Sequence, residues 1–344
     1  MLDPRYAYMS AYLKGEEPKV ATPEQIDGMS RASNIQDALA TIRETDVGSY
    51  LEGISIKTFD DLDEALWTYF AQCIKHVESS KMLPGGMRKV SRAYIVKYDV
   101  SNLKATLQGI STGEKSPMIP VGIIHNNGLL DKLSGVENVD DIIELLTKCE
   151  LGGYVPILKE YDTTGGAKSK LEVESRLDGE YYKSMLSMAK SIGDGAVLSK
   201  ALGLIIDLTN LQIVSRAIIE GIGTDAAECT IAGGYIITDK AIRDLLSFKL
   251  ADIPRRLENS QYRDIANEVL SSYDRTKSIT AVEEIIAKHK FRLLKEILSP
   301  VVLSPLVMAW YLILKEVEIR NLRLILKAIA DSMPVDEIKR YLVL

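Results

Sequence analysis

The chain has 344 residues, enough for two or three ordinary domains or for several copies of a repeat. Its net charge of −6 gives no general attraction to nucleic acid, and its three cysteines and three histidines are too scattered for a metal site. The cysteines predict reduced thiols in a cytoplasmic protein, and the polar start of the chain lacks the apolar core of a signal peptide.

Helix signals dominate the first part of the chain. The pattern predicts a short helix over residues 6–14. Thr22-Pro23-Glu24-Gln25 predicts another helix start, with threonine as the N-cap, proline in the first turn and glutamine completing a capping box. A long amphipathic helix is expected over residues 59–78, and a second over 90–110 after the Gly85-Gly86 break.

A motif of an acidic residue, two further residues and then Asn-Leu occurs three times. The copies are centred on residues 102, 210 and 321, with spacings of 108 and 111 residues. A fixed period of this kind indicates one structural unit used repeatedly. We therefore predict three similar helical units, over residues 1–115, 116–228 and 229–344. The motif residues are Asn102, Leu103, Asn210, Leu211, Asn321 and Leu322.

The end of the chain repeats the pattern of its beginning. Ser332-Met333-Pro334 resembles the helix start at Thr22-Pro23, so the C-terminal helix is expected to close onto the first unit. Such an overlap indicates a closed, pseudo-threefold ring and not an open solenoid. Few runs alternate with a period of two, and the best of them, residues 54–57, is short. We predict an all-α protein.

The recurring asparagine has two interpretations. Leu322, Ile325, Leu326 and Ile329 form the apolar face of a helix, and Asn321 lies one position off that face. Asparagine is a poor residue for a helix interior, so its recurrence indicates a specific hydrogen bond. We favour a polar lock on helix packing over a ligand site, because three ligand sites would each need ligand-binding groups that the sequence does not show.

Two other stretches suggest sites and are interpreted as structural. Residues 297–314 carry no charge over a length that could span a membrane, but Pro300 and Pro305 favour a helix buried on all sides. Residues 163–169 look faintly like a phosphate loop, yet Ala167 separates the glycine from Lys168, so we expect a flexible loop. The sequence therefore predicts no nucleotide, metal or cofactor site and no catalytic residues.

The C-terminal part resembles the C subunit of archaeal and bacterial A/V-type ATPases, whose eukaryotic equivalent is the vacuolar ATPase d subunit. The resemblance lies in residues 311–327, centred on Glu318-Ile319-Arg320-Asn321-Leu322-Arg323, and in residues 334–342. Residues 6–13 and 39–51 also look like that family. Ser10 stands where the family usually has asparagine, and residues 328–331 lack its Gly-Lys, which puts details of the partner surface in doubt.

The resemblance implies an all-helical fold of three similar domains around a funnel-like central cavity, and no catalytic activity. Family members form a socket between the central shaft, made of the D and F subunits, and the membrane rotor ring. They thereby couple ATP turnover to proton or sodium movement. The implied position is peripheral, on the cytoplasmic side of the membrane. Two alternatives are a soluble helical-repeat scaffold for unrelated proteins and a helical enzyme with a deep polar pocket.

Overall fold

Local capping chemistry sets many of the helix starts. In the computed structural model, which describes residues 3–344 except 57, 116 and 164–169, the side chain of Thr22 accepts the amide of Gln25 at 3.2 Å. The side chain of Gln25 in turn accepts the amide of Thr22 at 2.9 Å, so the predicted capping box is confirmed. Asn34 and Asn138 cap two later helices: the side-chain oxygen of each accepts the backbone amide of the aspartate three residues later. The side-chain amide of each asparagine donates to the carboxylate of that aspartate, which differs from the capping box at Thr22.

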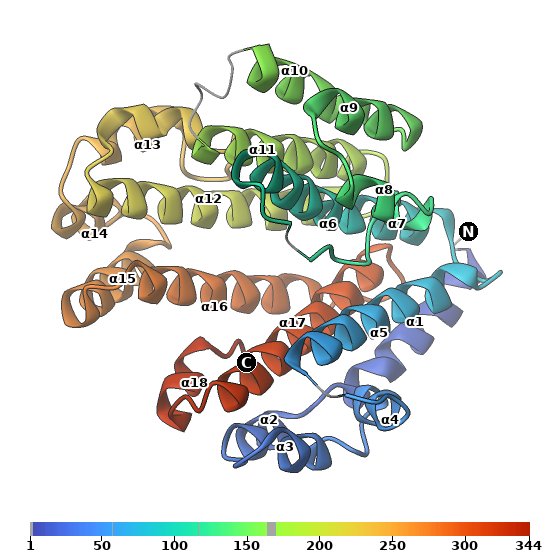
Figure 1. Ribbon diagram of the computed structural model, residues 1–344. Coiled ribbons are helices and arrows are strands. Elements are labelled where there is room, and N and C mark those ends of the chain that lie inside the picture. Colours follow the sequence, from blue (N-terminus) through green and yellow to red (C-terminus); the bar gives the residue numbers. More distant parts are fainter. Residues whose placement is uncertain (1–2, 57, 116, 164–169) are drawn as a thin grey trace.

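All regular elements of the described residues are helices, so the all-α prediction is confirmed (Figure 1). Their bounds are α1 Pro4–Glu16, η1 Glu17–Lys19, α2 Pro23–Ser30, α3 Ile35–Thr41, α4 Asp46–Glu52, α5 Phe59–Ser79, α6 Gly85–Thr112, α7 Ile123–Asn126, α8 Leu130–Ser134, α9 Val139–Lys148, η2 Gly152–Tyr154, α10 Val155–Thr163, α11 Lys170–Ala189, α12 Gly195–Glu220, η3 Gly223–Cys229, α13 Asp239–Leu246, η4 Leu250–Asp252, α14 Ile253–Arg256, α15 Arg263–Thr276, α16 Ile279–Leu298, α17 Leu306–Ala330 and α18 Val335–Tyr341.

Three hairpins of long helices form the frame of the molecule: α5–α6, α11–α12 and α16–α17. The second helix of each hairpin packs against the first helix of the next, α6 on α11 and α12 on α16. The last hairpin returns to the first, because α17 packs on α5 and also on α6. The contacts therefore form a closed cycle, and the three hairpin turns lie on the same side of the molecule (Figure 1).

The apolar faces of these helices form the core. A large cluster centres on α5, α6, α11 and α17, where Trp67, Phe70 and Tyr98 meet edge to face. A second cluster joins α12 to α13, α15 and α16. The short helices cover the outside of the frame: α2 and α3 contact α17, α10 contacts α11, and α15 contacts α16.

The expectation of one buried helix over residues 297–314 is wrong. Helix α16 ends at Leu298, and α17 begins only at Leu306. Pro300 and Pro305 lie in the turn between them, because proline cannot donate a helical hydrogen bond. Within the described residues one helix, α12, is long and apolar enough to cross a membrane, and two-thirds of its apolar window is buried inside the protein.

Two further sequence features lie partly outside the described residues. Ile54 to Ile56 form no strand, and Lys57 is not described. Thr163 ends α10, whereas residues 164–169 of the loop that resembles a phosphate loop are not described.

Candidate functional site

Each motif asparagine binds the backbone of one later residue through both groups of its side-chain amide. Asn102 donates to the carbonyl of Ile119 at 2.9 Å and accepts its amide at 2.8 Å. Asn210 does the same with Ile231, at 2.8 Å for both bonds. Asn321 does so with Val343, at 2.7 and 3.0 Å. These three pairs are called the asparagine clamps.

The clamps are buried, which makes both hydrogen bonds of each pair important. Asn102, Asn210 and Asn321 are 1–3% exposed, and the leucine that follows each is at most 1% exposed. A backbone amide or carbonyl left unpaired at such a depth costs free energy. The three asparagines therefore fix the path of the chain segment that follows each second helix.

The acidic residue three positions before each motif asparagine also binds the backbone of a later segment. Asp99 accepts the amides of Ile123 and Ile124 at 2.7 and 2.9 Å. Asp207 accepts the amides of residues 235–237 and the hydroxyl of Tyr262, which donates at 2.8 Å. Asp99 of α6 and Asp207 of α12 thus each hold a later chain segment against their own helix.

Glycines allow this close approach in the first two copies. A Cβ atom on Gly122, where φ is 128°, would lie 2.4 Å from a carboxylate oxygen of Asp99. One on Gly234 would lie 2.2 Å from a carboxylate oxygen of Asp207. Only a residue without a side chain fits at either position.

The third copy joins the two ends of the chain. Glu318 accepts the amide of Ala21, which directly precedes α2, at 2.9 Å. One turn later Asn321 clamps Val343, and Lys339 of α18 pairs with Asp27 of α2 at 2.5 Å. Lys315 lies beside Glu318 at 3.2 Å, and both side chains are almost completely buried.

Burial changes the acidity of the motif carboxylates. Desolvation raises the pKa of Asp99 to about 7, although the two amides that it accepts limit the rise. Desolvation also raises the pKa of Asp207, although its hydrogen bonds from Tyr262 and the backbone oppose the rise. Desolvation raises the pKa of Glu318 as well, and there the charge of Lys315 opposes the rise. These carboxylates bind backbone amides, and in the described part of the chain no three histidine, cysteine or acidic side chains are grouped so that they could hold a metal ion.

Charged side chains connect the frame helices. Glu316 of α17 pairs with Lys97 of α6 and accepts the hydroxyl of Tyr94. Lys104 of α6 pairs with Asp178 of α11 at 2.6 Å. Arg323 of α17 pairs with Asp63 of α5. The basic partners Lys104 and Arg323 each lie two residues after a motif asparagine, so the repeat extends to the ion pairs between hairpins.

Lys290 of α16 and Arg320 of α17 are close to this set of charges. Lys290 is partly accessible and Arg320 is exposed, yet desolvation lowers the pKa of both side chains, that of Lys290 to about 8. The negative charge of Asp178 acts on Lys290, and that of Glu316 acts on Arg320. Both side chains are therefore solvent-accessible cations close to the ion pairs between the hairpins. We call Lys97, Lys104, Asp178, Lys290, Glu316 and Arg320 the polar interior set.

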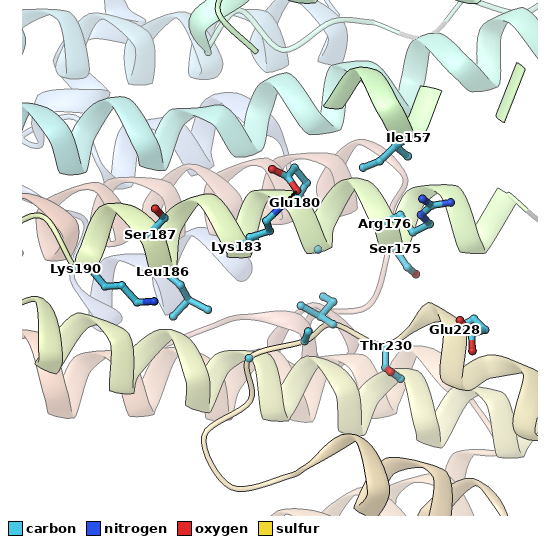
Figure 2. A pocket seen from close by; sticks show the side chains of 14 residues that line it. Ile157, Ser175, Arg176, Glu180, Lys183, Leu186, Ser187, Lys190, Glu228 and Thr230 are labelled. Atoms are coloured by element: carbon cyan, nitrogen blue, oxygen red, sulfur yellow. Dashed lines mark hydrogen bonds and ion pairs between the residues drawn. The ribbon is translucent and has the colours of Figure 1, made fainter. Parts of the chain in front are cut away.

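A pocket of about 570 Å³ lies between α11 and the segment clamped by Asn210 (Figure 2). Leu186 and Ile231 give it apolar walls, and charged residues of α11 form its rim. Its basic groups are largely neutralised, since Lys183 pairs with Glu180 at 2.9 Å and Arg176 with Glu160 at 2.7 Å. The pocket therefore offers little fixed charge for a phosphate group.

Comparison with known families gives a direct result. The sequence model of the family described as ATP synthase (C/AC39) subunit matches residues 9–341. The chain belongs to this family. Members are structural subunits of the ATP synthase complex, so this C/AC39 subunit is not an enzyme.

Curated relatives carry a consistent description. The chain is 24% identical to the C subunit of the A-type ATP synthase of Methanocaldococcus jannaschii, over 98% of this chain and 86% of the relative. It is 25% identical to that of Methanococcoides burtonii, over 98% and 94%. It is 24% identical to that of Thermococcus kodakarensis, over 98% and 90%. The match therefore extends over nearly all of this chain and most of each relative.

The sequence did not indicate the partners of the motif residues in this C/AC39 subunit. A clamped residue lies 17 to 22 positions after its asparagine, in a segment without a regular pattern. The glycines at 122 and 234 were the available signal, because each follows a motif acid by about two dozen residues. Lys104 and Arg323 each lie two residues after a motif asparagine, and this shared position is a signal in the sequence for their ion pairs.

Proposed function

We propose that this C/AC39 subunit is the central-stalk adaptor of an A-type rotary ATPase, a socket between the central shaft and the membrane rotor ring. The observation that carries the proposal is the closed cycle of helix hairpins, joined end to start by the Asn321–Val343 and Glu318–Ala21 contacts. A part that transmits torque must resist opening. A ring whose ends bind the same helix meets that need better than an open array.

The units of the ring are residues 1–115, 116–228 and 229–344, with the C-terminal helix closing onto the first unit. Each unit contributes one long hairpin and one asparagine clamp, which supports a pseudo-threefold arrangement around a funnel-like centre. The hairpin turns gather at one end, so the opposite end is the open side of such a funnel.

The shaft, made of D- and F-type subunits, enters from the open side and contacts the polar interior set. Lys290 and Arg320 support a largely polar joint, because both are accessible cations for which the described residues provide no ion pair. Charged contacts suit an assembly that forms and separates, and salt weakens them. The rotor ring lies on the side of the hairpin turns, at the cytoplasmic face of the membrane, and the ring carries protons or sodium ions.

Purification of the tagged protein from native membranes tests this role. The wild-type chain should recover shaft and ring subunits, and Lys290→Glu with Arg320→Glu should lose the shaft subunits. Lys240→Glu, an exposed change on α13, serves as the matched control and should recover both. Repeated recovery of unrelated soluble proteins, without shaft or ring, would support a general helical scaffold and reject the socket.

A further inference from the structure

A second cavity, of about 360 Å³, lies between α15, α16 and α18. Helix α15 lines it with Ser272 and Arg275, α16 with Glu284 and Lys288, and α18 with Arg340. Its volume is in the range of sites that bind small molecules. We call it the α15–α18 pocket.

The α15–α18 pocket lies away from the surfaces that the socket role assigns to the shaft and the rotor ring. Its residues from α16 fall between Ala281 and Lys288, whereas the hairpin turn on the rotor side follows Leu298 (Figure 1). Because a helix rises 1.5 Å per residue, the pocket ends about 15 Å before that turn. None of the described residues that line it belongs to the polar interior set. Its chemistry therefore needs an explanation of its own.

Three basic side chains from three different helices border the pocket without acidic partners. In the part of the chain that the structure describes, none of Arg275, Lys288 and Arg340 forms an ion pair or a side-chain hydrogen bond. The two arginines are exposed and Lys288 is half-buried, so all three can reach a ligand. A guanidinium group can donate two parallel hydrogen bonds to the oxygens of a carboxylate or a phosphate.

The acidic side chains that line the pocket do not balance these cations. Glu268 contacts His289 at 2.7 Å and is thereby occupied. Glu284 forms no ion pair among the described residues, although the charges of Lys288 and Arg340 act on its carboxylate. Burial raises the pKa of Glu284 in spite of those charges. The pocket therefore has an excess of positive charge, which an anion would balance.

Two serine hydroxyls add neutral hydrogen-bond donors to the same wall. Ser272 is 8% exposed and lines the pocket, and Ser271 beside it is exposed. Neither hydroxyl has a hydrogen-bond partner within the residues that the structure describes. A hydroxyl as buried as that of Ser272 normally has one. Hydroxyl, guanidinium and ammonium donors together match the oxygens of a phosphate group.

We propose that the α15–α18 pocket binds a small phosphate-bearing anion, which bridges α18 to the α15–α16 pair. Arg275 and Arg340 donate to the phosphate oxygens, and Lys288 adds a point charge. A phosphate group carries a charge of about −1.5 to −2 at pH 7, which balances the excess of cations. Because Lys339 of α18 already pairs with Asp27 of α2, the bound anion extends the ring closure to the third unit. The inference does not require the socket role.

Isothermal titration calorimetry of the purified full chain tests the proposal, with sodium chloride used to keep the ionic strength constant. Inorganic phosphate should bind at one site in the wild type. Arg275→Gln and Arg340→Gln should each raise the dissociation constant about tenfold. Glu284→Gln should bind phosphate more tightly than the wild type, because it removes the carboxylate that competes for the same cations. Arg243→Gln, an exposed change on α13, is the matched control and should bind like the wild type.

Glycerol 3-phosphate, titrated in the same way, distinguishes two sources of the phosphate group. Tighter binding than that of inorganic phosphate would identify a phosphate ester as the ligand, and weaker binding would identify the free ion. Absence of binding by both anions would overturn the proposal. Equal binding by Arg275→Gln, Arg340→Gln and Arg243→Gln would also overturn it, because the pocket would then not be the site.

Amide hydrogen exchange tests whether the anion bridges the two parts of the structure. Phosphate should slow exchange in residues 337–341 of α18 in the wild type and leave it unchanged in Arg340→Gln. Phosphate binding without slower exchange in this helix would overturn the bridge. Recovery of shaft and ring subunits from native membranes by Arg340→Gln reports on the socket role separately, and it should match that of the wild type.

Discussion

Asn321 and Val343 exchange two hydrogen bonds, of 2.7 and 3.0 Å, that hold the last residues of the chain on α17. The same exchange ties Ile119 to Asn102 and Ile231 to Asn210. In those two copies the bound segment continues into the next unit. In the third copy, Glu318, one turn before Asn321, binds Ala21 near the start of the chain. This contact connects the third copy to the first.

Removal of one asparagine clamp should destabilise the protein measurably. Asn210→Ala and Asn321→Ala each leave a buried amide and carbonyl without partners, so we expect a loss of about 1–3 kcal/mol in the free energy of unfolding. Chemical denaturation measures this loss. Asn259→Ala, at an exposed position, is the control and should change stability little. A neutral result at Asn321 would reopen its interpretation as a ligand site.

Deletion of residues 342–344 should reproduce the effect of Asn321→Ala at the other end of the same contact. The deletion removes Val343, so Asn321 keeps its side chain but loses both partners. Combining the deletion with Asn321→Ala should therefore cost less than the sum of the two separate losses, because both remove one interaction. Additive losses, measured by the same denaturation, would mean that the contact does not close the ring.

The leucine beside each asparagine should contribute through packing. Leu211 and Leu322 are at most 1% exposed, and truncation of either to alanine leaves a cavity in the core. We expect Leu211→Ala and Leu322→Ala to lower the free energy of unfolding by about 2–5 kcal/mol each. Leu344→Ala, at a side chain 60% exposed, is the control. Effects below about 1 kcal/mol at both buried leucines would contradict the assigned packing.

Stability should depend on pH through Asp99. Burial raises its pKa to about 7, so the folded state binds this proton more tightly than the unfolded state. The stability that Asp99 contributes is fully present below the ordinary carboxyl pKa, and it is lost as the pH rises through 7. Between pH 5 and pH 8, the ionisation of Asp99 alone should lower the free energy of unfolding of the wild type by about 2–3 kcal/mol. Asp99→Asn should lack that loss.

The measurement is the difference in unfolding free energy between wild type and Asp99→Asn at several pH values. That difference isolates Asp99 from other groups that titrate in the same range. The wild-type advantage over Asp99→Asn should shrink between pH 5 and pH 8. The exposed change Asp140→Asn should instead run parallel to wild type. A constant difference for Asp99→Asn would mean that its two amide partners keep it ionised throughout.

The helices could be predicted because the signals for them lie close together in the sequence. The Asn-Leu motif, the Thr22 capping box and the apolar stripes depend on residues within a few positions of one another. The turn at residues 299–305 is not predicted, because Pro300 and Pro305 are interpreted as arguments against a membrane span and not as the end of one helix and the start of the next. Its exposed Val302 and Leu303 look like core residues in a sequence.

The contacts that close the ring could not be predicted in the same way. Glu318 meets Ala21 across almost the whole chain, and nothing near Ala21 in the sequence marks it as a partner. From the sequence alone, Lys315 is expected to be solvated, yet it is 1% exposed. Such pairs depend on which helices come together, which is decided by the whole fold. The resemblance to a family implied an all-helical fold but not these contacts.

The buried pair of Lys315 and Glu318 should be strongly coupled. The two side chains lie 3.2 Å apart at the closure, where Lys315 also contacts the hydroxyl of Tyr69 and Glu318 binds Ala21. Lys315→Met leaves a buried carboxylate without its cation, and Glu318→Gln leaves a buried ammonium without its anion. Each single change should cost about 3–5 kcal/mol, whereas the double change should recover much of that loss.

A double-mutant cycle measured by chemical denaturation determines this coupling. The exposed pair of Lys327 in α17 and Asp331 directly after that helix, 3.0 Å apart, is the matched control, and Lys327→Met should cost at most about 1 kcal/mol. If the ring closes through Glu318, the single variants should also become more sensitive to proteolysis at the N-terminal segment before α2, and the double variant less so. Equal losses in both pairs would show that burial of Lys315 and Glu318 does not couple them.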